Sequence, residues 1–131
     1  MEPSPSSSPS RDVLDLAAEG VRPIARLLNL ILSEAFLSRS SEIQMQSSSG
    51  LCVIRFLREG TWNDVMTMPG PGGQLLVNRV RALAGADRTG GQPTHHGELH
   101  VLSQGTEVTL KVTVHEPGSG SEEVVILVPN P

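Results

Sequence analysis

Residues 23–47 read PIARLLNLILSEAFLSRSSEIQMQS and combine the strongest helix pattern of the chain with an alternating strand. Apolar residues recur there at intervals of three and four, a spacing that places them on one side of a helix. They are Ile24, Leu28, Ile31 and Ala35, with Leu27 and Leu32 widening the stripe. Pro23 suits the first helical turn, where its missing N–H needs no partner. We therefore expect a helix from Pro23 whose apolar side seeds the core.

The same helix has a polar side. Arg22, Arg26, Asn29 and Ser33 follow one another at helical spacing, opposite the apolar stripe. We interpret this side as solvated surface, and the alternative is a contact surface for a protein partner.

Three strands are expected after this helix. In residues 42–46, Ile43 and Met45 alternate with polar residues, which is typical of a half-buried strand. Residues 51–57 are apolar on both sides, so we expect a strand in the interior of a sheet. A short third strand is expected around residues 62–66.

The second half of the chain repeats this order. Residues 68–73, MPGPGG, are predicted to form a loop, and a helix is expected over residues 74–84 with Gly85 as its stop. Residues 86–97 are interpreted as an irregular connection. Strands are then expected at residues 99–101, 108–114 and 123–128, with turns at residues 104–105 and 118–121.

The start of the chain has a different composition. Residues 1–10, MEPSPSSSPS, are predicted to be a disordered tail, and residues 11–131 a single α+β domain. Ser10 and Gly20 are suited to cap a short helix over residues 11–19. We expect an antiparallel sheet of about six strands with two main helices packed on it.

Composition narrows the classes of function. The chain has 131 residues and a net charge of −4, which argues against nucleic acid as a partner. The single cysteine, Cys52, fits a reducing compartment, and the sequence has neither a signal-peptide pattern nor an apolar run long enough to span a bilayer. We therefore expect a cytoplasmic domain without direct membrane insertion.

Four segments in the same order resemble the N-terminal domain that precedes the motor domain in type II secretion and type IV pilus assembly ATPases. The first segment matches the family pattern P-x-x-x-L-x-N-x-I-L-x-E-A. The segments are PIARLLNLILSEA (23–35), SSEIQMQ (40–46), VIRFLREG (53–60) and RVRALAGAD (79–87). The resemblance covers roughly residues 21–128, and it implies a PAS-like α+β fold.

The chain departs from that family at polar positions. Gln44 stands where the family has a histidine, Leu57 replaces the second arginine of V-R-F-R-I-D-G, and Lys111 replaces a later arginine. The phosphate-binding pattern G-x-x-x-x-G-K-[ST] of the motor domain does not occur in the chain. In the family, arginines of this domain reach toward nucleotide held by an adjacent motor domain. The resemblance therefore makes Arg55 a candidate nucleotide contact, and the alternative is an ordinary outward-facing strand arginine.

Other chemically active residues do not form a recognisable site. His95, His96 and His100 lack a cysteine or carboxylate at ligand spacing, so we expect no metal. Cys52 is interpreted as a small buried hydrophobe, and the pair Glu122–Glu123 as exposed charge.

The leading hypothesis is a non-catalytic adaptor related to the secretion and pilus ATPases, with no catalytic residue and no cofactor. Its partner would be an assembly ATPase, another component of such a machine, or a second copy of itself. The alternative is a PAS-like sensor that holds a small molecule in a closed apolar cavity of about 300 Å³ or more. A remnant with little independent role is a third possibility.

Overall fold

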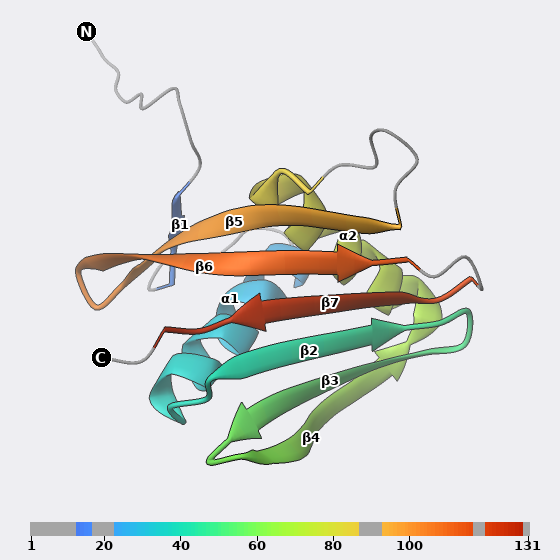
Figure 1. The fold of residues 1–131 in the computed structure, drawn as a ribbon, viewed down its shortest axis with the longest axis horizontal. Helices are drawn as coiled ribbons and strands as arrows, with labels where there is room; N and C mark the ends of the chain where they lie inside the picture. The colour runs from blue at the N-terminus through green and yellow to red at the C-terminus, as the bar shows by residue number, and fades with distance from the viewer. Residues whose placement is uncertain (1–12, 17–22, 87–92, 117–119, 130–131) are drawn as a thin grey trace, which may run out of the picture.

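The computed structural model describes residues 13–16, 23–86, 93–116 and 120–129 as two helices and a seven-stranded sheet (Figure 1). This is an α+β fold, as the sequence predicts. The elements are β1 (Val13–Asp15), α1 (Pro23–Leu37), β2 (Glu42–Ser47), β3 (Leu51–Arg58), β4 (Thr61–Pro69), α2 (Gly70–Ala84), β5 (Thr94–Ser103), β6 (Thr106–His115) and β7 (Glu122–Leu127).

The sheet has the order β1-β5-β6-β7-β2-β3-β4, and every neighbouring pair is antiparallel except β1 with β5. Two three-stranded units, β2-β3-β4 and β5-β6-β7, each consist of strands consecutive in the chain. They join where the last strand, β7, pairs with β2. The middle of the sheet is therefore made by residues about eighty positions apart in sequence, such as Gln44 and Val125.

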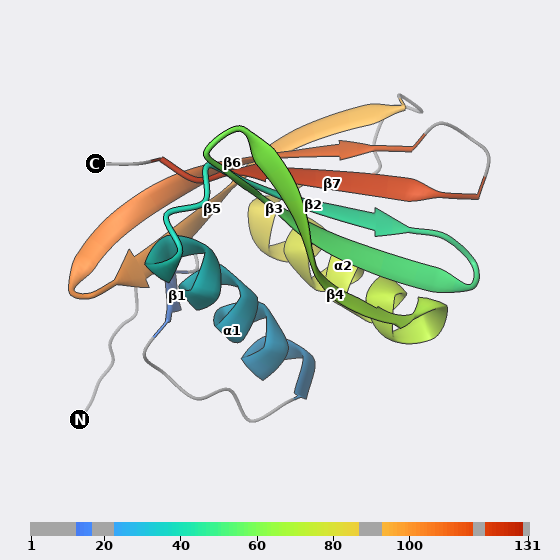
Figure 2. The same cartoon turned by 90° about the horizontal axis from the view of Figure 1, so that it is seen from below.

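Both helices lie on the same face of the sheet (Figure 2). The core fills the space between the helices and the sheet, because strand side chains alternate and every second one points toward the helices. The core of the described residues is almost entirely aliphatic. Its largest fully buried side chains are Phe56, Leu28, Leu32, Ile43, Met45, Ile54, Leu76, Leu99, Leu110 and Ile126.

Helix α1 presents the predicted apolar stripe to this core. Leu28, Ile31, Leu32 and Ala35 are buried, and Ile24 and Leu27 are partly buried against them. Helix α2 contributes Leu76, Val77 and Val80. It ends at Gly85, whose left-handed backbone (φ 72°) closes the helix as predicted.

The helix predicted over residues 11–19 is wrong in its described part. Val13–Asp15 form strand β1, which pairs in parallel with His100–Leu102 of β5, and Leu16 N–H donates to the Leu102 carbonyl at 3.0 Å. The edge of β5 offers backbone groups that a short, weakly apolar helix does not, so tertiary pairing overrides the local pattern. Residues 1–12 and 17–22, including the predicted tail, Gly20 and Arg22, lie outside the described residues.

The loop predicted over residues 68–73 is also wrong. Strand β4 continues to Pro69, and α2 begins at Gly70. The glycines serve close packing here: a Cβ on Gly70 would lie 2.4 Å from the Ser49 carbonyl oxygen, and one on Gly73 would lie 2.2 Å from Cys52 Cβ. Pro71 lies in the first turn of α2, where proline is well tolerated.

Strand β5 begins at Thr94, five residues before the predicted strand. Residues 94–97 pair with β6, with Thr94 opposite His115 and Gly97 opposite Val112. A Cβ on Gly97 would lie 2.1 Å from the Ala84 carbonyl oxygen, so glycine lets the end of α2 approach the strand. The predicted turn at Gln104-Gly105 is confirmed, with both residues at positive φ. Residues 87–92 and 117–119 lie outside the described residues.

Among the described residues, neither helix is long and apolar enough to cross a membrane.

Candidate functional site

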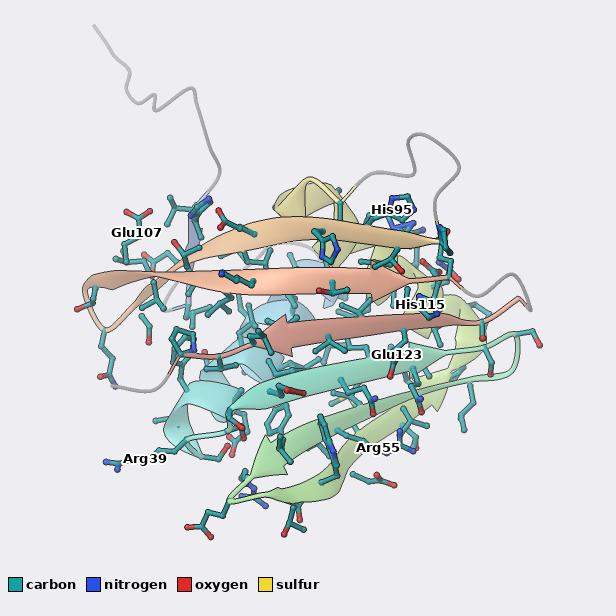
Figure 3. All side chains as sticks on the ribbon, in the orientation of Figure 1. Arg39, Arg55, His95, Glu107, His115 and Glu123 are labelled. Carbon is teal, nitrogen blue, oxygen red and sulfur yellow. The ribbon has the colours of Figure 1, made fainter. Side chains whose placement is uncertain are left out.

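The face of the sheet that points away from α1 and α2 carries no helix among the described residues. It is turned toward the viewer in Figure 3, where Arg55, His115 and Glu123 are labelled. We call it the open face. Strand alternation supplies its side chains, and one row runs across six strands. In strand order from β4 to β5, that row is Asp64, Arg55, Gln44, Val125, Thr113 and His96.

Arg55 is the centre of a hydrogen-bonded chain on this face. Its Nε donates to Asp64 Oδ1 at 2.8 Å, and its Nη1 donates to Gln46 Oε1 at 2.6 Å and to Gln44 Oε1 at 3.2 Å. Gln44 Nε2 in turn donates to the Glu123 carboxylate. The chain thus links β4, β3, β2 and β7 and holds the guanidinium in one orientation.

The ion pair leaves part of Arg55 available. Its side chain is 28% exposed and that of Asp64 is 66% exposed. The three hydrogen bonds use Nε and Nη1, and no hydrogen bond of Nη2 is found within the described part of the chain. The guanidinium is therefore oriented and can still donate to a partner group.

Apolar side chains surround this polar chain. Trp62 stands opposite Leu57, which pairs with Glu42, and Glu42 pairs with Leu127 on its other side. Trp62 is 43% exposed and Leu127 44% exposed. Amphipathic and aliphatic groups around an oriented arginine are the composition expected of a protein-binding surface.

A hollow of about 360 Å³ opens at the end of the open face beside Arg55's network. It is lined by Gln46, Ser47, Ser48, Leu51, Val53, His115, Ser121, Glu122 and Glu123. A second hollow, of about 460 Å³, lies between the turn after α1 and the β3–β4 turn. Arg39, Arg58 and Glu59 line it, with three polar neighbours.

The predicted histidine residues do not gather into a ligand set. His96 and His100 lie on the open face beside threonines of β6, with His96 Nδ1 3.3 Å from Thr113 Oγ1 and His100 Nδ1 3.3 Å from Thr109 Oγ1. His95 points to the other side of the strand and is buried. Within residues 13–16, 23–86, 93–116 and 120–129, no three His, Cys, Asp or Glu side chains are placed to hold a metal ion.

The interpretation of Glu122 as exposed charge is wrong. Glu122 lies on the helix side of β7 and is buried, and it accepts hydrogen bonds from Arg81 of α2 and from Gln74 Nε2 at 2.9 Å. Arg81 also donates to Glu116 Oε2 at 2.7 Å. Since Glu122 stands one residue before an alternating apolar strand, its position in the register places it inward, and the sequence contains this signal.

Cys52 is buried on the helix side of β3 against Gly73, as the sequence predicts. Burial raises the pKa of its thiol because the thiolate would lose solvation. A raised pKa lowers the fraction of thiolate, so this cysteine is poorly suited to act as a nucleophile.

The second set of candidate residues lies far from Arg55, on α1 behind the sheet. Arg26 is exposed, whereas Asn29 and Ser33 are partly buried, and Asn29 Nδ2 donates to the Asp15 carbonyl at 3.4 Å. Arg22 lies outside the described residues. The most exposed large apolar residues of α1 are Leu30 and Leu37, which sequence reasoning missed. Each follows a residue of the buried stripe, Leu28 or Ala35, by two positions, which places it on the opposite side of the helix. This spacing was the signal in the sequence.

No protein-family model matches the chain. Type II secretion system protein E of Aeromonas hydrophila is 30% identical over 117 residues, which cover 89% of this chain and 23% of that protein. The protein of the same name from Pseudomonas aeruginosa is 30% identical over 104 residues, 79% of this chain and 20% of that protein. Type II secretion system ATPase E of Vibrio cholerae is 29% identical over 111 residues, 85% of this chain and 22% of that protein.

The chain spans about a fifth of the length of these curated relatives. The matches nevertheless cover 79–89% of this chain. The chain is therefore related, over most of its length, to one part of type II secretion system protein E.

Proposed function

We propose that this chain is a non-catalytic protein-interaction domain of a type II secretion or type IV pilus machine, and that it binds its partner with the open face. The partner is an assembly ATPase or another component of the machine. The observation that carries the proposal is the oriented arginine on the open face, which also exposes Trp62 and Leu127.

The chemistry of the described residues supports binding more than catalysis. Two ionisable groups of the open face have defined partners: Arg55 pairs with Asp64, and Glu123 accepts a hydrogen bond from the neutral amide of Gln44. A nucleophile with an adjacent base, or a pair of carboxylates with divided roles, would favour an enzyme. The one thiol, Cys52, is buried in the core instead.

Arg55 is proposed as the central residue of this surface. Its family match favours a contact to nucleotide bound in a neighbouring motor domain, where a guanidinium would stabilise phosphate charge. The alternative is a contact to a carboxylate or carbonyl group of a protein, which can accept from Nη2 while Nε and Nη1 keep their hydrogen bonds. Either contact requires the partner to approach the open face.

The proposal is tested by site-specific photo-crosslinking in a bacterium with a type II secretion system. A photoreactive residue at Leu127 or Trp62 is expected to capture a machine component, and adding Arg55→Ala should reduce the yield severalfold. Arg58→Ala is the matched control, since Arg58 lies three residues away on the same strand, at its exposed end by the hairpin.

Two results would contradict the proposal. The first is an equal yield with Arg55→Ala and with the unchanged chain. The second is ATP hydrolysis by the purified chain, clearly above background, that a substitution in the chain abolishes.

The sensor alternative receives less support. It needs a closed apolar cavity between the sheet and the helices, whereas the two hollows described above open at the surface. A small apolar ligand that raises the melting temperature of the chain would support the sensor alternative.

A further inference from the structure

The side of α1 that faces away from the sheet has an ordered pattern of charge and apolar groups. Its exposed residues are Pro23, Arg26, Leu30, Glu34 and Leu37. Leu30 is 62% exposed and Leu37 70% exposed. Residues three and four apart lie in line on a helix, so these five form one stripe opposite the buried side. We call it the outer stripe.

The outer stripe is symmetric about its middle. Arg26 lies four residues before Leu30 and Glu34 four residues after it, while Pro23 and Leu37 lie seven residues before and after. A two-fold rotation about an axis through Leu30 therefore places Arg26 of one copy opposite Glu34 of the other, twice. The same rotation places Leu30 against Leu30 and Pro23 against Leu37.

We infer that the outer stripe binds a second copy of this chain, with the two α1 helices antiparallel. Charge complementarity selects this partner: each copy supplies both the cation and the anion at matched distances from a central leucine. The inference does not rest on the proposed function, because α1 and the open face lie on opposite sides of the sheet (Figure 2).

The groups involved are compatible with such a contact. Glu34 is exposed. The Ser38 hydroxyl donates to the backbone carbonyl of Glu34 at 2.8 Å and not to its carboxylate. Arg26 takes part in a contact within the chain. A guanidinium has five N–H donors, so it can keep that contact and donate to a carboxylate of the second copy as well.

The contact is small, and the dimer is accordingly weak. Helix α1 has 15 residues. At about 1.5 Å per residue it is about 22 Å long, so one pair of helices buries less than the roughly 1,200 Å² of a stable interface. We expect a dissociation constant of about 0.1 mM, with dimer visible in a concentration series by sedimentation velocity.

Charge reversal gives the sharpest test. Arg26→Glu and Glu34→Arg should each weaken self-association about tenfold, because each creates two like-charge contacts per dimer. The double variant R26E/E34R should restore the dimer. A mixture of the two single variants should form heterodimers more readily than either forms homodimers, because both charge pairs are then complementary.

Cysteine cross-linking tests the antiparallel register. Leu30→Cys should give a reducible dimer rapidly, because packed helices 8–10 Å apart bring two Cα atoms on the axis within disulfide range. Leu37→Cys should cross-link slowly, because its two copies lie about 21 Å apart along the helices. Buried Cys52 does not compete.

A matched control is Leu75→Glu on α2, which changes a leucine 57% exposed and should leave self-association unchanged. Leu30→Glu should abolish it without unfolding the chain. The inference is overturned by a chain that stays monomeric up to about 1 mM, or by self-association that Leu30→Glu and both charge reversals leave intact.

Discussion

Two arginine networks lie on opposite faces of the same sheet and differ mainly in burial. Arg81 on the helix side is 8% exposed and contacts Glu116 and Glu122. Arg55 on the open face is 28% exposed, and its partner Asp64 is 66% exposed. The first network lies where water cannot replace a lost partner, whereas the second lies where it can. Similar chemistry is therefore enclosed in the fold on one face and partly open to solvent on the other.

The largest expected effect comes from placing a charge on the core side of α1. Leu28→Asp removes about 1.5–3 kcal/mol of apolar burial and buries an unpaired carboxylate, which together exceed the margin of a small domain. We expect the variant to lack a cooperative thermal transition. Leu30→Asp, two residues away on the outer stripe, should change the free energy of unfolding by about 0.5 kcal/mol or less.

Circular dichroism melts at low protein concentration, below the range of the proposed dimer, make this comparison. A cooperative melt of Leu28→Asp near that of the unchanged chain would contradict the placement of α1.

The buried network comes next in size. Arg81→Ala leaves Glu122 buried and without its cation, and breaking one side of a buried pair costs about 3–5 kcal/mol. Urea denaturation should show that loss as a lower midpoint with an unchanged slope. The double variant Arg81→Met with Glu122→Leu should recover much of it, because no charge is then left buried.

A loss below about 1 kcal/mol for Arg81→Ala would mean that water reaches this network. The Arg81 and Arg55 networks would then not differ in their access to water.

The difference between the two networks also shows what sequence reasoning can reach. Helix α1 and the strands β2, β3 and β6 were predictable because the periodicity of their own residues sets which side is buried. The family resemblance likewise depended on local segments such as 23–35 and 53–60. Both kinds of signal are contained in short stretches of chain.

What was missed depends on contacts between distant segments. Strand β1 has three residues and exists because β5 offers it an edge. Gly70 and Gly73 looked like loop residues, and they are required by the approach of α2 to Ser49 and Cys52. Arg81 and Glu122 lie 41 residues apart, so no local pattern pairs them.

In the candidate site, too, local features were predictable and contacts between distant segments were not. The sequence could single out Arg55 and place it outward by strand alternation, and the structure confirms that placement. Its hydrogen bonds to Asp64, Gln44 and Gln46 depend on the register of three strands, which alternation alone does not fix. Similarly, the polar side of the first helix was predicted from four residues, Arg22, Arg26, Asn29 and Ser33. The packing of the helix instead turned Leu30 and Leu37 most fully to solvent.

The smallest expected effect on stability is that of Arg55→Ala. An exposed ion pair contributes about 0.2–1 kcal/mol, so the urea midpoint should move only slightly. Arg55→Lys should retain the charge and lose the fork that reaches Asp64 and both glutamines at once. If the open face serves recognition, both variants should weaken capture of the partner severalfold while the fold stays intact. A loss of stability as large as that of Arg81→Ala would instead make Arg55 a structural residue, and the two faces would then share one role.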